Sequence, residues 1–69
     1  MDHPWYEVWA DETLDVPYLL LVLPTAEGFE ILDPKEGGCR VFASPDYVDV
    51  VDWLCADEYR RVGRVEPVD

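Results

Sequence analysis

Residues Tyr18–Leu23, with the sequence Tyr-Leu-Leu-Leu-Val-Leu, are apolar at every position and lie between Pro17 and Pro24. The two prolines limit this segment to the length of a strand, because proline removes a backbone donor and clashes with a preceding helical turn. A strand that is apolar on both faces needs cover on both faces. Tyr18–Leu23 is therefore predicted to be the central strand of a sheet, and each of its faces requires a covering layer.

Shorter segments around this strand also have the character of strands. Trp5–Ala10 alternates between two sets of side chains, and Phe29–Leu32 follows a tight connection. Cys39–Ala43 comes after Asp33–Gly38, where a proline and two glycines predict a turn. Connections this short cannot hold a parallel crossover, so we expect an antiparallel meander.

The periodicity changes at Ser44-Pro45-Asp46, which is typical of a helix start with Ser44 as the cap and Pro45 at the first helical position. Beyond it, apolar residues recur at helical spacing, at Tyr47, Val50, Val51, Leu54 and Cys55. The helix is expected to end near Asp57 or Glu58. Tyr59–Val65 is a candidate for a last short strand, with Gly63 as a bulge or bend. The predicted fold class is α+β, a small antiparallel sheet of three to five strands with one amphipathic helix packed on one face.

The length of 69 residues predicts one domain, residues 1–69, whose ends at 1–4 and 66–69 are expected to fray. A chain of about 60 residues buries only about 60% of its unfolded surface, so separate catalytic and cofactor domains do not fit. The composition is 49% hydrophobic and includes three Trp, four Tyr and two Phe. Such a content excludes a disordered acidic tail, which is poor in aromatic residues.

Sixteen acidic residues against five Lys and Arg give a formal net charge of −11. This charge repels nucleic-acid phosphates and anionic lipid surfaces, so neither nucleic acid nor a membrane is expected as a partner. The longest apolar run is far shorter than the roughly 20 residues that span a bilayer. Residues 1–5 have neither the basic region nor the apolar region of an export signal, so a cytoplasmic location is expected.

Residues suited to catalysis are few. His3 is the single histidine and lies near a chain end, and Cys55 falls in the apolar stripe of the helix, where a thiol packs as a small hydrophobe. Cys39, beside Arg40, has no base arranged to serve it. Both cysteines are expected to be reduced and mostly packed. Glu7 and Glu30 are the acids that lie within apolar stretches, and both occupy strand positions with solvent-facing or mixed neighbours. We expect no enzyme, no small-molecule substrate and no cofactor.

Two charged clusters have simple structural interpretations. Asp46, Asp49 and Asp52 lie near one side of the helix, but no EF-hand pattern is present, so a solvated face without metal is expected. The basic cluster of three arginines is expected to pair with acids at the end of the helix, and it comprises Arg60, Arg61 and Arg64, with Asp57 and Glu58 as partners.

The strand pattern leaves apolar side chains on the sheet face away from the helix. We expect the helix to cover Tyr6, Val8, Leu20, Val22, Phe29, Ile31 and Val41. The opposite face then holds Trp9, Leu19, Leu21, Leu23, Leu32 and Phe42, which we predict to be interface residues. Such a patch is larger than a soluble monomer normally exposes, unless Trp5, Trp53 or the C-terminal segment folds over it.

The sequence therefore predicts a small acidic interaction module that forms a homodimer or binds a partner protein through an apolar sheet face. The alternative is an acidic inhibitor or nucleic-acid mimic, whose carboxylates occupy the phosphate sites of a basic protein. The two hypotheses differ in the surface they use, because the first needs exposed apolar strands and the second needs a continuous ridge of acids.

Overall fold

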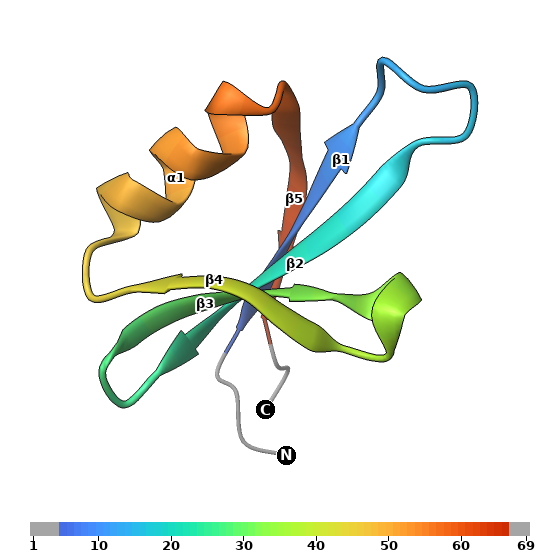
Figure 1. The fold of residues 1–69 in the computed structure, drawn as a ribbon. Coiled ribbons are helices and arrows are strands. Elements are labelled where there is room, and N and C mark those ends of the chain that lie inside the picture. The colour runs from blue at the N-terminus through green and yellow to red at the C-terminus, as the bar shows by residue number, and fades with distance from the viewer. Residues whose placement is uncertain (1–4, 67–69) are drawn as a thin grey trace.

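The computed structural model describes residues 5–66 and has a five-stranded antiparallel sheet with one helix packed on it, which confirms the predicted α+β fold (Figure 1). The elements along the chain are β1 (Tyr6–Asp11), β2 (Tyr18–Thr25), β3 (Gly28–Asp33), the 3-10 helix η1 (Pro34–Glu36), β4 (Cys39–Ser44), α1 (Tyr47–Ala56) and β5 (Tyr59–Val65). The strand order across the sheet is β4-β3-β2-β1-β5, so the predicted central strand β2 does lie in the middle.

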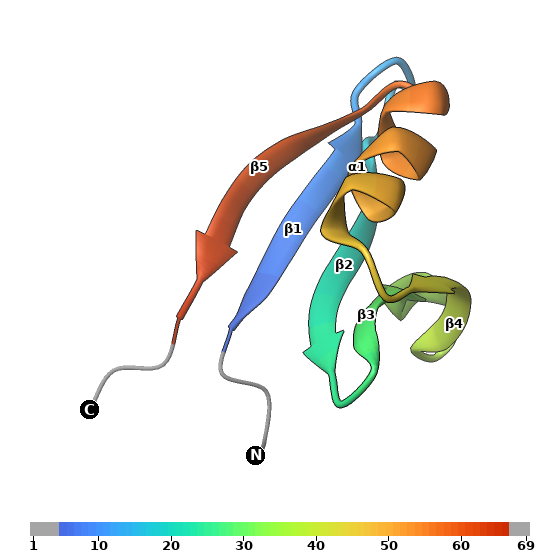
Figure 2. The ribbon, with the colours of Figure 1, turned by 90° about the vertical axis from the view of Figure 1, so that its left-hand side faces the viewer.

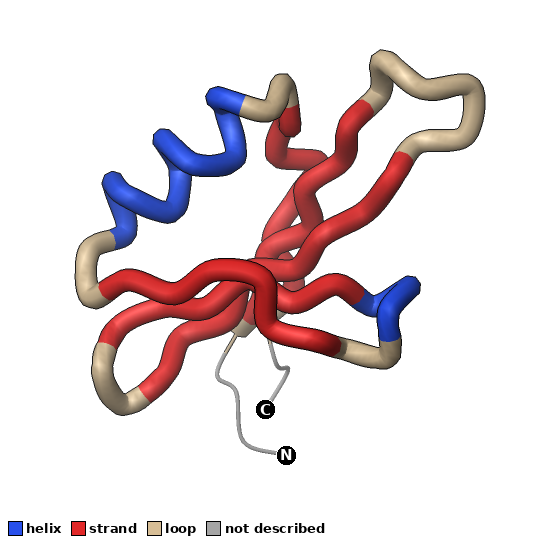
Figure 3. The backbone as a smooth tube through the Cα atoms, in the orientation of Figure 1, coloured by secondary structure: helices blue, strands red, loops and turns tan. Residues whose placement is uncertain are grey.

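Strands β1 to β4 form the expected meander, and α1 carries the chain from one edge of the sheet to the other (Figure 3). After α1, the last segment returns as strand β5 and pairs antiparallel with β1. Figure 2 shows β5, β1 and β2 side by side with the helix on one side of them. The candidate strand Tyr59–Val65 is therefore formed, and β4 and β5 are the two edges of the sheet.

The turn between β3 and β4 has the side-chain hydrogen bonds and glycine conformations that the sequence indicates. The carboxylate of Asp33 accepts hydrogen bonds from the backbone N–H of Lys35 at 3.0 Å and of Glu36 at 3.3 Å. Gly37 and Gly38 follow with φ of 75° and 82°, values that glycine adopts without strain. The turn predicted at Asp33–Gly38 is thus confirmed.

The start of α1 differs from the predicted Ser44 cap. The helix begins at Tyr47, with Asp46 in the capping position, and it ends at Ala56. Ser44 instead shapes the preceding turn, because its Oγ accepts from the backbone N–H of Asp46 at 3.2 Å and donates to Asp49 Oδ2 at 2.9 Å. Pro45 accordingly lies before the helix and not at its first position.

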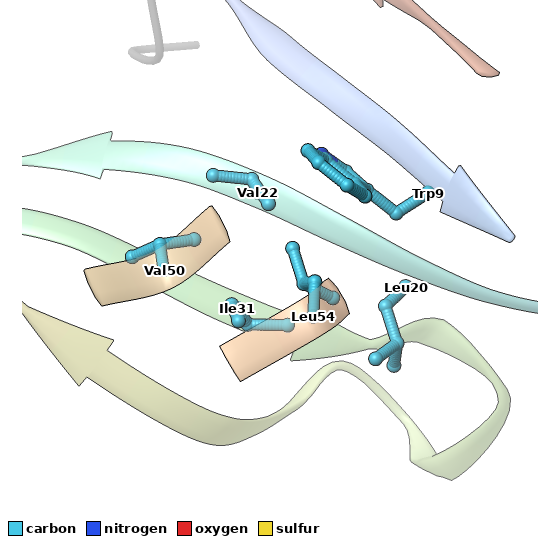
Figure 4. Packing of buried hydrophobic residues seen from close by; sticks show 6 residues of the cluster. All are labelled: Trp9, Leu20, Val22, Ile31, Val50 and Leu54. Atoms are coloured by element: carbon cyan, nitrogen blue, oxygen red, sulfur yellow. The ribbon is translucent and has the colours of Figure 1, made fainter. Parts of the chain in front are cut away.

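The core lies between α1 and the sheet. Val50 and Leu54 of the helix are fully buried against Val22 and Ile31 of the central strands (Figure 4). Each such aliphatic side chain contributes about 1.5–3 kcal/mol when it is removed from water. The complete buried cluster is Trp9, Leu20, Val22, Ile31, Val50 and Leu54.

The face assignment of β1 was wrong by one residue. Glu7 and Trp9 are buried on the helix-covered face, and alternation therefore turns Tyr6 and Val8 to the other side. Glu7 can occupy a buried position because its carboxylate accepts hydrogen bonds from side chains of α1 and β5. Trp9 is thus a core residue and not part of an uncovered face.

The face assignment of β4 was also wrong, because a bulge shifts its register. Ile31 pairs with Phe42 and Leu32 pairs with Arg40, so Val41 is the extra residue between them. Phe42 consequently faces α1, where its ring stacks on Trp53 at a centroid distance of 5.3 Å. Val41 is exposed and does not line the helix-covered face.

Candidate functional site

The sheet face that α1 does not cover, here called the open face, is built from alternate residues of the strands. Its centre is a row of three side chains across neighbouring strands, since Val8 pairs with Leu21 and Leu21 pairs with Leu32. The strand residues of the open face are Tyr6, Val8, Ala10, Leu19, Leu21, Leu23, Glu30, Leu32, Arg40, Ala43, Arg60, Gly63 and Val65. Of the six predicted interface residues, the open face thus contains Leu19, Leu21, Leu23 and Leu32.

Exposure varies across the open face. Leu23 is buried, and Leu21 and Leu32 are partly buried. Among its apolar side chains, Leu19 and Val65 are the most exposed, at 45% and 47%. The row Val8–Leu21–Leu32 is therefore a partly buried centre, and the most exposed apolar residues lie at the periphery of the open face.

Neither tryptophan considered as a cover for the open face lies on it. Trp53 stacks on Phe42 on the side of α1. Trp5 also belongs to the helix-covered side, because its ring lies 6.1 Å from Phe29, which packs on the buried core. Trp5 and Trp53 therefore do not cover the open face.

The open face carries little of the chain's negative charge. Glu30 is its one acidic strand residue, and Arg40 Nη1 lies 3.9 Å from Glu30 Oε1. Arg60, at the other side of the sheet, lies 3.2 Å from Glu12. Since two arginines and one glutamate occupy its strand positions, this surface differs sharply from the remainder of a chain with net charge −11.

A second feature is the fully buried carboxylate of Glu7 on the helix-covered side. It accepts hydrogen bonds from Trp9 Nε1 at 3.0 Å and from the Tyr47 hydroxyl at 2.7 Å to each oxygen. Arg64 donates from Nε at 3.2 Å and from Nη2 at 2.7 Å, and Arg61 Nη1 lies at 3.4 Å. This cluster joins β1, the first residue of α1, and β5.

The hydrogen bonds keep Glu7 ionised despite its burial. Desolvation alone raises the pKa of the carboxyl group, but the donors Arg64, Tyr47 and Trp9 outweigh it and hold the pKa below the usual 4.5. The pKa of Tyr47 is raised by its burial and by the hydrogen bond that it donates to Glu7. A carboxylate saturated by protein donors has no free position for substrate, so the cluster has the character of a structural ion pair.

The arginines therefore do not pair as predicted. Arg61 and Arg64 bind Glu7 rather than acids at the end of α1, and Arg64 also lies 3.8 Å from Glu66. The reason is topological, since β5 pairs antiparallel with β1 and the carboxylates that face it belong to β1 and the loop after it. No local spacing in the sequence marks the partnership of Glu7 with residues 54 and 57 positions later.

The cysteines are both free and both exposed. The expectation that Cys55 packs in the core was wrong, because the buried stripe of α1 is confined to Val50 and Leu54. One hollow of about 380 Å³ lies beside Phe29 and another of about 430 Å³ lies beside Leu19, and neither of them is lined by a cysteine.

The aspartates of α1 and its cap, Asp46, Asp49 and Asp52, are exposed as expected. Within residues 5–66, no group of three or more His, Cys, Asp or Glu side chains is arranged to hold a metal ion. His3 lies outside the described residues.

Comparison of the chain with protein-family models, with curated proteins and with solved structures found no match in any of the three. In the described part of the chain, no helix has the length and apolar character needed to cross a membrane. The open face and the charges around it are therefore the features on which a functional proposal rests.

Proposed function

We propose that this chain is a small acidic interaction module that self-associates through the open face. The observation that carries the proposal is the row Val8–Leu21–Leu32, which crosses the three central strands on the side that α1 leaves uncovered. The buried core of an interface between identical subunits is more apolar than the rest of a protein surface, and this row fits such a core. Exposed Leu19 and Val65 extend the apolar surface beyond the row.

Charge favours a second copy as the occupant of this face. Two chains of net charge −11 repel each other, and contact through α1 would bring the carboxylates of Asp46, Asp49 and Asp52 together. The strand positions of the open face instead carry Arg40, Arg60 and the single acid Glu30. Copies that meet face to face across a two-fold axis therefore bury apolar strands and keep their acidic surfaces apart.

The molar mass in light scattering tests this proposal. At about 0.1 mM, where micromolar association is saturated, the wild-type chain is expected at twice the 8.0 kDa of one chain. Leu19→Lys places a charge on the open face at an exposed position, so we expect a monomer that is still folded. Leu21→Asp, at the centre of the row, should do the same.

Val48→Lys is the matched control, because Val48 is exposed on α1 and lies away from the open face. This variant should remain a dimer. A wild-type monomer at this concentration would contradict the proposal, as would equal loss of the dimer in the Val48 and Leu19 variants.

A cytoplasmic location is part of the same proposal. The two free, exposed thiols of Cys39 and Cys55 support it, because thiols stay reduced in the cytoplasm and are readily oxidised outside it. Localisation of a tagged chain by fractionation tests it, and recovery of the chain in an exported fraction would contradict it.

An acidic inhibitor or nucleic-acid mimic is the second candidate. It is supported by the five exposed carboxylates of residues 46–58, a stretch without Lys or Arg. The open face is preferred because further exposed acids, including Glu12 and Glu27 in loops and Glu36 in η1, lie elsewhere and do not extend the acidic surface of α1. Binding to a basic protein that weakens steeply with salt, and that is lost in Asp49→Asn with Asp52→Asn, would favour this candidate.

A further inference from the structure

Strand β5 forms one edge of the sheet, with β1 on its inner side and no strand on its outer side among residues 5–66. Such an edge presents unpaired backbone N–H and C=O groups to an incoming strand. Its sequence is unusual for this chain, because Tyr59–Val65 contains three of the five Lys and Arg residues and no Asp or Glu. The edge is therefore a cationic line on a strongly acidic molecule.

The arginine side chains of this edge have carboxylate partners within the chain but remain partly exposed. Arg61 and Arg64 share the carboxylate of Glu7, with Arg61 at the longer distance of 3.4 Å, and Arg64 also lies 3.8 Å from Glu66. The side chain of Arg61 is 54% exposed, and that of Arg60 is 79% exposed beside Glu12. Two guanidinium groups on adjacent residues thus remain accessible to an external anion.

Apolar side chains accompany these charges. Val62 is the extra residue of a bulge, since Arg61 pairs with Trp9 and Gly63 pairs with Val8, and its side chain is 62% exposed. The bulge prevents long regular pairing along the edge, so a bound strand can pair only over a short stretch. Affinity at such an edge must come chiefly from charge and from contact with Val62.

We propose that the edge strand β5 binds an extended acidic segment of a partner protein, which adds to the sheet by backbone pairing while its carboxylates meet Arg60 and Arg61. A second copy is a poor occupant, because its own β5 carries the same three arginines and its β4 carries Arg40 and no acid. The outer backbone edge of β5 is distinct from the open face, although the side chain of Arg60 belongs to that face, and strand pairing at this edge does not depend on self-association.

A fluorescein-labelled peptide of about eight residues, with repeats of two Glu followed by two Val, is a suitable probe. Its length is within that of natural strands, and adjacent Glu residues present a carboxylate on each face, as the opposite directions of Arg60 and Arg61 require. Fluorescence anisotropy of the wild-type chain should show saturable binding, and amide chemical shifts should change along β5. Arg60→Glu should weaken binding about fivefold or more, since it replaces an attractive charge with a repulsive one.

Arg40→Glu is the matched control, with the same change of charge on the opposite edge, and its affinity should stay within about twofold of the wild type. Arg60→Gln removes the charge but keeps a polar side chain, and it provides a second variant if Arg60→Glu does not fold. The proposal is overturned if the wild-type chain does not bind the peptide saturably, if the Arg40 and Arg60 variants lose affinity equally, or if the shifts map to the row Val8–Leu21–Leu32 and not to β5. A peptide in which Lys replaces each Glu and that binds equally well would also overturn it.

Discussion

Arg64 Nη2 lies 2.7 Å from Glu7 Oε2, at a pair of residues that face each other in the register of β1 and β5. The guanidinium of Arg64 also lies 4.3 Å from the centre of the Trp5 ring, a cation–π contact. Because Tyr47 of α1 donates to the same carboxylate, one buried charge connects the first strand, the helix and the last strand. The edge strand β5 therefore owes its position partly to Glu7.

Replacement of Glu7 by Gln is expected to lower the free energy of unfolding by about 1.5–3 kcal/mol at neutral pH, because it removes the buried charge to which Tyr47 and Arg64 donate and turns an amide N–H2 toward one or more of these donors. Urea unfolding followed by tryptophan fluorescence measures the change, at one fixed chain concentration because association also stabilises. Glu12→Gln removes only the exposed contact with Arg60 and should cost less than about 1 kcal/mol. Equal losses of unfolding free energy in the two variants would contradict this prediction, because the buried cluster would then stabilise the fold no more than an exposed ion pair.

The stabilising effect of Glu7 should depend on pH. The folded-state pKa of Glu7 lies below 4.5, so its contribution is complete above the unfolded pKa and is lost as the pH falls through the folded value. The difference in unfolding free energy between the wild type and Glu7→Gln should therefore be constant from about pH 7 to about pH 5 and shrink at lower pH. A difference that grows on acidification would mean that the pKa of Glu7 is raised and not lowered.

Gly28 cannot be replaced without strain. Its φ is 144°, and a Cβ at this position would overlap the backbone of Pro45 and lie 2.5 Å from the carbonyl oxygen of Ser44. Gly28→Ala should destabilise the fold by more than about 1 kcal/mol, while Gly63→Ala, with open space around it, should change stability by less than about 1 kcal/mol. Thermal unfolding distinguishes the two, and an unchanged midpoint for Gly28→Ala would contradict the close approach.

Elements governed by neighbouring residues were predictable from the sequence. The prolines around Tyr18–Leu23 set the central strand, although β2 continues through Pro24 to Thr25. The turn at Asp33–Gly38 and the helical spacing of Val50 and Leu54 depend on contacts within a few residues, and both are confirmed.

Features that depend on distant residues were not predictable. Trp5–Ala10 has apolar side chains on both of its faces. Because Glu7 lies on the face of Trp5 and Trp9, the sequence favours the opposite face, with Tyr6 and Val8, as the buried one. Donors that lie far away in the sequence, Tyr47 of α1 and the arginines of β5, make the burial of Glu7 favourable together with Trp9. For the same reason Trp9 was assigned to the interface, while Leu19, Leu21, Leu23 and Leu32 were placed on the open face correctly.

β-Bulges account for the remaining differences between the predicted and the observed faces of side chains. The extra residues Val41 and Val62 reverse the alternation of β4 and β5, and neither valine carries a sequence signal of a bulge. Gly63, which was the expected bulge or bend, is instead paired with Val8. A shift of one residue moves Phe42 from the open face to the helix-covered face.

Contacts between copies test the central claim most directly. In a mixture of isotope-labelled and unlabelled chains, filtered nuclear Overhauser effects report only protons that are close across the interface. Self-association through the open face predicts such effects between the methyl groups of Val8, Leu21 and Leu32 in one copy and those in the other. Intermolecular effects confined to α1 or to the helix-covered face, or none at a concentration where the mass is that of a dimer, would contradict it.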